Sequence, residues 1–370
     1  MVNRERLVKN FMELVKIDSL SLKEKKVAEF AAAQLRKLGF EVKFDNAHKP
    51  YGGETGNLIA YKKGDRKKKG VAIVAHMDTV VPGEHISPRI EKGLIKSDGN
   101  TILGADDKAG IAAMIEAARI LSEQKISHGP VYFIMTIGEE QGLYGAKQLN
   151  LKSIKAEYFF ILDSEGAVGR VVVSAPSQNS VNAEFIGKAA HAGVNPEDGI
   201  NSIAAASKAI SRMKLGRIDK ETTANIGKIE GGMATNIVPE KTTIFGEARS
   251  RNEDKLRKQT EQMVKSIKEA ARITGAKVKI MVKKEFGAFK LGPNHEIVKV
   301  VTACLKQIGK TISLESTGGG SDTNVFNSRG VQAVNLAVGM ENVHTKKEQI
   351  KISELTAAAE MVLSLITFNR

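Results

Sequence analysis

Five side chains of metal-binding type stand at the ends of apolar segments of the sequence or follow them. Ligands of open α/β sheets gather at the carboxyl ends of strands, where residues far apart in sequence can meet. Imidazoles together with carboxylates suit zinc, cobalt or manganese better than calcium or magnesium. The sequence therefore predicts a transition-metal site at one sheet edge. Its candidate members are His76, Glu139, Glu140, Asp163 and His344.

The apolar segments themselves predict the elements that position these side chains. Near-continuous apolar runs of this length are typical of strands covered on both faces. They occupy residues 71–76, 131–138, 157–163 and 332–339, and a helical pattern (109–123) lies between the first two. Buried strands that alternate with helices predict an α/β sandwich.

Three aspartates join the candidates, each with an ordinary structural alternative. His76 and Asp78 lie two apart on a strand and point to the same side, so Asp78 could orient the imidazole. Asp106 and Asp107 stand where a glycine-containing turn enters a helix, where acids also cap helices. We interpret Asp107 as a helix cap and Asp106 as a metal ligand.

The adjacent pair Glu139–Glu140 can serve one site only where the strand breaks into a turn, because neighbouring strand residues face opposite ways. Gly138 and Gly142 permit such a turn. One glutamate as ligand and the other as general base is the arrangement that metal-assisted amide hydrolysis requires. A solvated acidic loop is the alternative.

The remaining patterns define the domain organisation. Ser21 and Glu24 form a capping-box pattern before a helix that ends at Gly39. Residues 180–286 read as βαββαβ, the split βαβ signature of a small domain, and α/β patterning resumes after Gly292. We expect a first catalytic segment at 1–178, an inserted domain at 179–289 and a second catalytic segment at 290–370.

Composition excludes several classes of protein. Hydrophobic residues make up 42% and charged residues 26% of 370 residues, and no apolar run is long enough to span a membrane. A single cysteine, Cys304, excludes an internal disulfide and is expected to be buried. Without a disulfide framework or an export signal, we expect a cytoplasmic protein.

The net charge of +14 raises the question of nucleic-acid binding. The densest basic run, at 62–69, contains no interleaved aromatic residue and lies between two strand-like segments. We interpret it as a solvated hairpin tip and expect no nucleic-acid partner.

Six motifs, in this order and spacing, resemble those of the M20 metallopeptidases, most closely the peptidase T-like branch. They are AHMDTV, LGADDKAG, GEEQGLYGA, ILDSEG, KAAHAGV and ENVHTKKEQ. The resemblance covers essentially the whole chain. It implies a zinc-exopeptidase-like α/β/α catalytic domain with an inserted ferredoxin-like lid and dimerisation domain, and a homodimer.

The resemblance also implies two divalent metal ions, with zinc expected and cobalt or manganese as alternatives. One ion would be held by His76 and Asp163, the other by Glu140 and His344, with Asp106 bridging them across a cis peptide bond to Asp107. Asp78 would orient His76, and Glu139 would be the general base as a metal-bridging water attacks the amide carbonyl. The implied substrate-binding residues are His191, Asn236 and Arg249.

The implied substrate is a short peptide, cleaved by an exopeptidase of the tripeptide aminopeptidase type. Two departures leave alternatives open: the connection from Asp78 to Asp106 is shorter than in peptidase T proper, and Thr345 follows His344 where that enzyme has glycine. The alternatives are an N-acyl-amino-acid deacylase or a carboxypeptidase with the same metal centre, or a non-catalytic binding protein.

Overall fold

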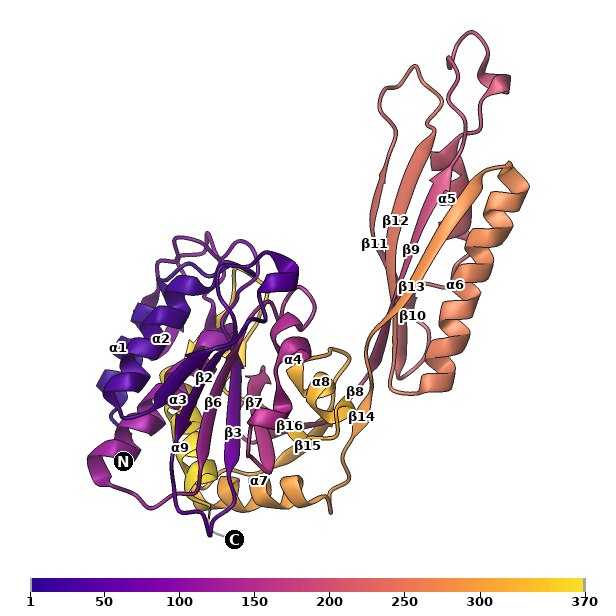
Figure 1. Cartoon of the computed structure of the whole chain (residues 1–370). Helices are drawn as coiled ribbons and strands as arrows, with labels where there is room; N and C mark the ends of the chain where they lie inside the picture. Colours follow the sequence, from indigo (N-terminus) through magenta and orange to yellow (C-terminus); the bar gives the residue numbers. More distant parts are fainter. Residues whose placement is uncertain (1, 369–370) are drawn as a thin grey trace. The chain divides into compact units, whose positions relative to one another are not determined.

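The computed structural model describes residues 2–368. The chain divides into two compact units (Figure 1). The first contains Met1–Val173, Leu291–Ser316 and Ser321–Arg370, and the second contains Ser174–Lys290 with Thr317–Gly320. Sequence patterning did not predict that the short segment Thr317–Gly320 belongs with the second unit.

A mixed sheet forms the centre of the first unit, and its nine strands include the short β14, whose residues fall within the bounds of the second unit. Its order is β1-β2-β6-β3-β7-β16-β8-β14, and β15 pairs with β8. Strands β3, β6, β7 and β16 are parallel neighbours, as their continuous apolar runs predicted. The bounds are β1 Glu41–Phe44, β2 Leu58–Lys62, β3 Val71–His76, β6 Val131–Thr136, β7 Tyr158–Ser164, β8 Arg170–Ala175, β14 Phe289–Lys290, β15 Ser313–Ser316 and β16 Gln332–Ala337.

Helices cover both faces of this sheet, which confirms the predicted α/β/α architecture (Figure 1). On one face α3, which is buried over most of its length, packs on α1, α9 and strands β3 and β7; on the other, α4 and α8 contact each other. The bounds are α1 Arg4–Val15, α2 Lys25–Lys37, α3 Ala105–Gln124, α4 Tyr144–Gln148, α7 Glu296–Gln307, α8 Asp322–Ser328 and α9 Ile352–Thr367. Among the described residues, none of the helices combines the length and apolarity that crossing a bilayer requires.

A small four-stranded sheet in the first unit was not predicted. Its order is β17-β18-β5-β4. Strands of two or three residues carry no periodic signal, so a sequence pattern cannot reveal them. The pairing of β18 with β5 brings the 342–348 loop beside the turn that precedes α3. The bounds are β4 Arg89–Glu91, β5 Leu94–Lys96, β17 Met340–Glu341 and β18 Gln349–Lys351.

The predicted capping box at Ser21 and Glu24 is wrong. Helix α2 begins at Lys25, and its N-cap Glu24 makes no side-chain capping hydrogen bond. Instead, the Ser21 hydroxyl donates to Asp78 at 2.6 Å, and the Glu24 carboxylate accepts from Leu22 N and Gly138 N. The contacts of Ser21 with Asp78 and of Glu24 with Gly138 are tertiary, and local sequence does not encode them.

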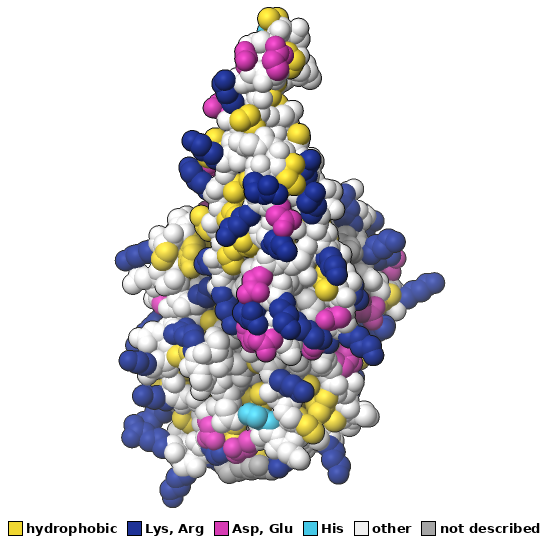
Figure 2. Space-filling model, turned by 90° about the vertical axis from the view of Figure 1, so that its right-hand side faces the viewer, with side chains coloured by type: hydrophobic (Ala, Val, Ile, Leu, Met, Phe, Trp, Pro, Cys, Tyr) yellow, Lys and Arg dark blue, Asp and Glu magenta, His cyan; other side chains and the backbone are white. Residues whose placement is uncertain are grey.

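The basic run at 62–69 does not form a hairpin tip, because β6 lies between β2 and β3 in the sheet. Part of the run is tied to its surroundings: Lys62 Nζ donates to Leu38 O at 2.6 Å, and Lys69 Nζ contacts Glu296 at 3.1 Å. On the face shown in Figure 2, Lys and Arg side chains are interspersed with Asp and Glu. Cys304 is fully buried, as predicted.

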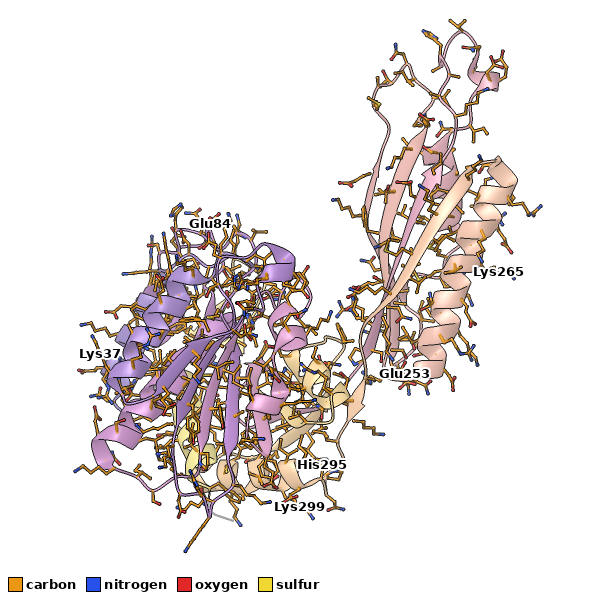
Figure 3. All side chains as sticks on the ribbon, in the orientation of Figure 1. Lys37, Glu84, Glu253, Lys265, His295 and Lys299 are labelled. Atoms are coloured by element: carbon orange, nitrogen blue, oxygen red, sulfur yellow. The ribbon has the colours of Figure 1, made fainter. Side chains whose placement is uncertain are left out.

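The second unit is a five-stranded antiparallel sheet of order β10-β11-β12-β9-β13. The predicted βαββαβ order is confirmed, with the short strand β10 added at one edge. Apolar residues of α5 and α6 pack on the sheet, while Lys265 of α6 projects away from it (Figure 3). The bounds are β9 Ser177–Ile186, α5 Ser202–Ser211, β10 Gly216–Arg217, β11 Thr222–Gly231, β12 Lys241–Ser250, α6 Glu253–Thr274 and β13 Lys277–Phe286.

Candidate metal centre

The carboxyl ends of β3 and β7, together with the start of α3, place His76 beside two carboxylates. His76 Nε2 lies 2.9 Å from Asp106 Oδ1 and 3.8 Å from Asp163 Oδ1. The imidazole is 2% exposed, so burial keeps water from competing for its ring nitrogens. The Asn335 side chain of β16 fixes Asp163 by hydrogen bonds to both its backbone N and its backbone O.

A second group forms on the other oxygen of Asp106. His344 Nε2 lies 3.2 Å from Asp106 Oδ2 and 2.9 Å from Glu140 Oε1. The backbone of His344 is left-handed, with φ of 62°, on the loop between β17 and β18. Asp106 therefore presents one carboxylate oxygen to each imidazole.

The turn that carries Asp106 is held by a buried carboxylate, Glu348. Glu348 Oε2 accepts from Leu103 N and Gly104 N at 2.8 and 2.7 Å, and Oε1 accepts from Asp106 N at 2.9 Å. Burial raises the pKa of Glu348 to about 7. The Asp106–Asp107 peptide bond is cis, as the resemblance implied.

Asp107 is not the N-cap of α3, which is Gly104, but lies in the first turn of that helix and also contacts β3. Its Oδ1 accepts from Gly110 N at 3.2 Å, while Oδ2 accepts from His76 N at 3.3 Å. The side chain is fully buried. It therefore joins the start of the helix to the strand that ends at His76.

Asp78 contacts both His76 and the glutamate turn. His76 Nδ1 lies 2.9 Å from the backbone O of Asp78 and 3.4 Å from its Oδ1. The two carboxylate oxygens accept from Glu139 N at 3.0 Å and from Glu140 N at 3.1 Å. Asp78 thus fixes the backbone of the glutamate pair, a contact that the sequence did not predict.

The charges in the cluster do not balance. Four carboxylates, those of Asp106, Glu139, Glu140 and Asp163, surround two imidazoles. Burial and then neighbouring carboxylates raise the pKa of Asp163 and of Glu139 well above their ordinary values. Hydrogen bonds with Asp106 and Glu140 raise the pKa of His344 to about 10.

This donor set fits divalent cations. Buried carboxylates without enough positive charge are costly, and a bound cation removes that cost. Two groups of three side chains have ligand atoms within 4.8 Å of one another: His76, Asp106 and Glu140, and His76, Glu139 and Asp163. Either group can hold a metal ion, and His76 is common to both.

Two buried acids of this region were missed by sequence analysis. Glu348 stands four residues after His344, and Asp322 directly follows the Gly318–Ser321 turn. Asp322 Oδ2 accepts from Thr136 Oγ1 at 2.6 Å, its Oδ1 has no partner among the described residues, and burial raises its pKa to about 6. The only sequence signal for Asp322 was an acid after a glycine-rich turn. The same pattern is typical of the first residues of a helix, so it does not single out a functional acid.

The three predicted substrate-binding residues all belong to the second unit. Ala192 N donates to Asn236 O at 3.0 Å, so the His191 and Asn236 loops are neighbours, and both side chains are exposed. Arg249 lies near the opposite end of β12, where its guanidinium is held by both oxygens of Glu247 at 2.8 and 3.0 Å. Within this unit the structure therefore brings His191 and Asn236 together, but not Arg249.

An α/β/α unit with an imidazole–carboxylate cluster at the carboxyl ends of its parallel strands has the architecture of a metal-dependent hydrolase. The chain belongs to peptidase family M20/M25/M40, whose family model matches residues 72–367. Within that family it falls in the peptidase T-like branch, as the six motifs predicted.

Three similar proteins illustrate the relationship. The structure of the aminopeptidase PepT from Bacillus cereus is 46% identical, with a TM-score of 0.87 over 99% of this chain and 98% of that chain. A tripeptidase from Staphylococcus aureus is 40% identical, with a TM-score of 0.91 over the same shares. Peptidase T of Clostridium perfringens is 26% identical over 96% of this chain and 97% of its own length.

Proposed function

We propose that this protein is a two-metal aminopeptidase that hydrolyses short peptides, tripeptides above all. The observation that carries the proposal is Asp106, whose two oxygens lie 2.9 and 3.2 Å from two imidazoles, one at the end of strand β3 and one on the loop between β17 and β18. The similarity to an aminopeptidase PepT and to a tripeptidase supports the choice of substrate.

The proposed ligands divide into two sets that share Asp106. His76 and Asp163 belong to one set, Glu140 and His344 to the other, and zinc is the metal that their imidazole and carboxylate atoms favour. Bound divalent ions of this kind lower the pKa of water toward about 7 and polarise an amide carbonyl. Asp78 and Glu348 hold the turns that carry these ligands.

Glu139 is the proposed general base. Its backbone is fixed by Asp78, and its carboxylate lies with His76 and Asp163. A carboxylate beside the proposed ligands His76 and Asp163 is placed to accept a proton from a water molecule at the centre. Glu139 takes the proton of the attacking water and delivers it to the leaving amine.

We further propose that the second unit supplies substrate binding and dimerisation. His191, Asn236 and Arg249 are the residues that the family resemblance implies for contact with the substrate and its terminal carboxylate. Arginine suits a carboxylate because its planar fork meets both oxygens, as Arg249 already does with Glu247. A cytoplasmic location is also proposed, supported by the single, buried cysteine.

The test combines metal analysis with peptide hydrolysis. We expect close to two equivalents of a transition metal, release of the N-terminal residue from Leu-Gly-Gly, and loss of activity after chelation. N-acetylated Leu-Gly-Gly should not be cleaved. Glu139→Gln should lower kcat by about 100-fold or more, because general base catalysis of this kind contributes roughly 10²–10⁴-fold.

The control is Glu29→Gln, which alters an exposed glutamate of α2 and should leave kcat unchanged. Preferred cleavage of the acetylated peptide would instead indicate a deacylase. A chain that stays inactive with zinc, cobalt and manganese would be a binding protein.

A further inference from the structure

Residues 17–24, the segment between α1 and α2, contact three of the turns that form the metal centre. Lys108 Nζ donates to Ile17 O at 2.7 Å, next to the turn of Asp106. Thr79 N donates to Ser19 O at 2.9 Å, directly after Asp78. The segment therefore touches the 106–108 and 78–79 turns through its own backbone.

Ser21 and Glu24 extend these contacts to the third turn, which carries Glu139 and Glu140. Ser21 Oγ donates to Asp78 Oδ2, and Asp78 in turn accepts from the N–H groups of both glutamates. Glu24 reaches the same turn directly, because its Oε1 accepts from Gly138 N at 2.9 Å. Two side chains of one short segment thus hold one turn by separate routes.

The carboxylate of Glu24 does not serve its own helix. Glu24 occupies the N-cap of α2, but its side chain makes no capping hydrogen bond and turns toward Leu22 N and Gly138 N. A capping acid would accept from N–H groups of the first helical turn. The direction of the side chain is therefore explained by the glutamate turn and not by the helix.

The burial of Glu24 is costly and calls for such an explanation. The side chain is 0% exposed, and among the ion pairs of the described residues none joins it to a cationic group. Its Oε2 has no hydrogen-bond partner in residues 2–368, and burial raises its pKa to about 7. An apolar residue would fill this space at lower cost if packing were its only role.

We propose that Glu24 is a positioning residue for the turn that carries Glu139 and Glu140, with Ser21 assisting through Asp78. The inference rests on the proposed function, which makes these two glutamates the base and a metal ligand. Hydrogen-bond partners that orient ligands commonly affect metal affinity by 10–100-fold, and a misplaced base lowers kcat.

The test compares Glu24→Ala with Glu24→Gln. Glutamine keeps one acceptor oxygen for Leu22 N and Gly138 N, and its amide takes the place of the oxygen that has no partner. We expect Glu24→Ala to weaken binding of one of two zinc equivalents by about 10–100-fold, measured by competition with a chromophoric chelator. Its kcat for Leu-Gly-Gly should fall by at least about tenfold, with KM within about threefold, and Glu24→Gln should restore both values.

Ser21→Ala provides a second variant and should shift zinc affinity in the same direction by a smaller factor. Glu29→Ala is the matched control on α2, and thermal unfolding shows whether each variant is folded.

Wild-type zinc affinity and kcat in Glu24→Ala would overturn the inference, as would a Glu24→Gln variant no better than Glu24→Ala. A wild-type chain that binds zinc but cleaves no peptide overturns the proposed function alone, since the affinity comparison still decides the role of Glu24. A wild-type chain that binds no metal overturns both.

Discussion

At the scale of single residues, the metal centre depends on acids that would not themselves bind metal. Glu348 accepts hydrogen bonds from three N–H groups around Asp106. It belongs to the loop between β17 and β18, far from Asp106 in sequence. Removing one of its oxygens leaves a buried N–H without an acceptor, which costs about 1–3 kcal/mol.

We therefore predict that Glu348→Gln weakens zinc binding by about 10–100-fold. The glutamine amide would face an N–H donor and displace the turn of Asp106. Zinc titration against a chelator measures the effect, and Lys347→Ala, at an exposed neighbour, is the control. Equal zinc affinity in Glu348→Gln and wild type would contradict this role.

Cys304 yields a prediction about reactivity. Burial raises the pKa of its thiol to about 11, so the reactive thiolate is a minor species at neutral pH. We expect no labelling by iodoacetamide in the folded protein between about pH 7 and 9, and full labelling after unfolding in urea. Mass spectrometry measures the extent of labelling. Rapid labelling of the folded chain would contradict the prediction, because it would show that the thiol is accessible.

The strand-end residues could be predicted because parallel strands bring their carboxyl ends to one edge, and His76 and Asp163 each end such a strand. The roles of Glu24 and Glu348 could not, because the N–H groups of the metal centre that they accept from lie 114 and 242 to 245 residues away. Contacts over such separations produce no pattern in the local sequence. The spacing of Ser21 and Glu24 also matched a capping box that does not form.

At the scale of elements, the turn after β6 is the most constrained part of the centre. Gly138 has φ of 55°, and a Cβ atom there would lie 2.8 Å from Tyr144 Cδ2. The turn is also joined to Glu24 and Asp78 by its N–H groups. A side chain at this position would shift both glutamates.

Gly138→Ala should therefore lower kcat by at least about tenfold and reduce stability by about 1–3 kcal/mol. Peptide kinetics and urea unfolding measure the two effects. Gly292→Ala is the matched control, since Gly292 lacks positive φ and a Cβ atom there would meet nothing within 4 Å. The prediction fails if both alanine variants behave alike.

Long elements were predictable, and short ones were not. Four apolar runs predicted the parallel strands, and the βαββαβ pattern predicted the second unit. Both predictions were possible because these elements are long enough to show a periodic pattern. The prediction of a hairpin around residues 62–69 was wrong, because β6 lies between β2 and β3 in the sheet. Strand β6 begins at Val131, far from β2 and β3 in sequence. Adjacency in sequence was a poor guide to adjacency in this sheet.

At the scale of the whole molecule, we predict a homodimer formed through the second unit. Its edge strand β13 leaves Met281 67% exposed and Val282 45% exposed, and unpaired edges of this kind favour pairing with another chain. Light scattering at micromolar concentration should give twice the chain mass of 40.0 kDa. A mass of one chain at that concentration would contradict the prediction.

The position of β16 has a consequence for synthesis on the ribosome. This strand lies between β7 and β8 in the sheet, yet it is translated about 170 residues after β7, and the second unit is translated in between. At roughly 5–20 residues per second, the edge of β7 waits about 10–30 s for its neighbour. During that interval an apolar strand edge is open to wrong partners, so we expect aggregation of the nascent chain to be favoured until β16 has been translated.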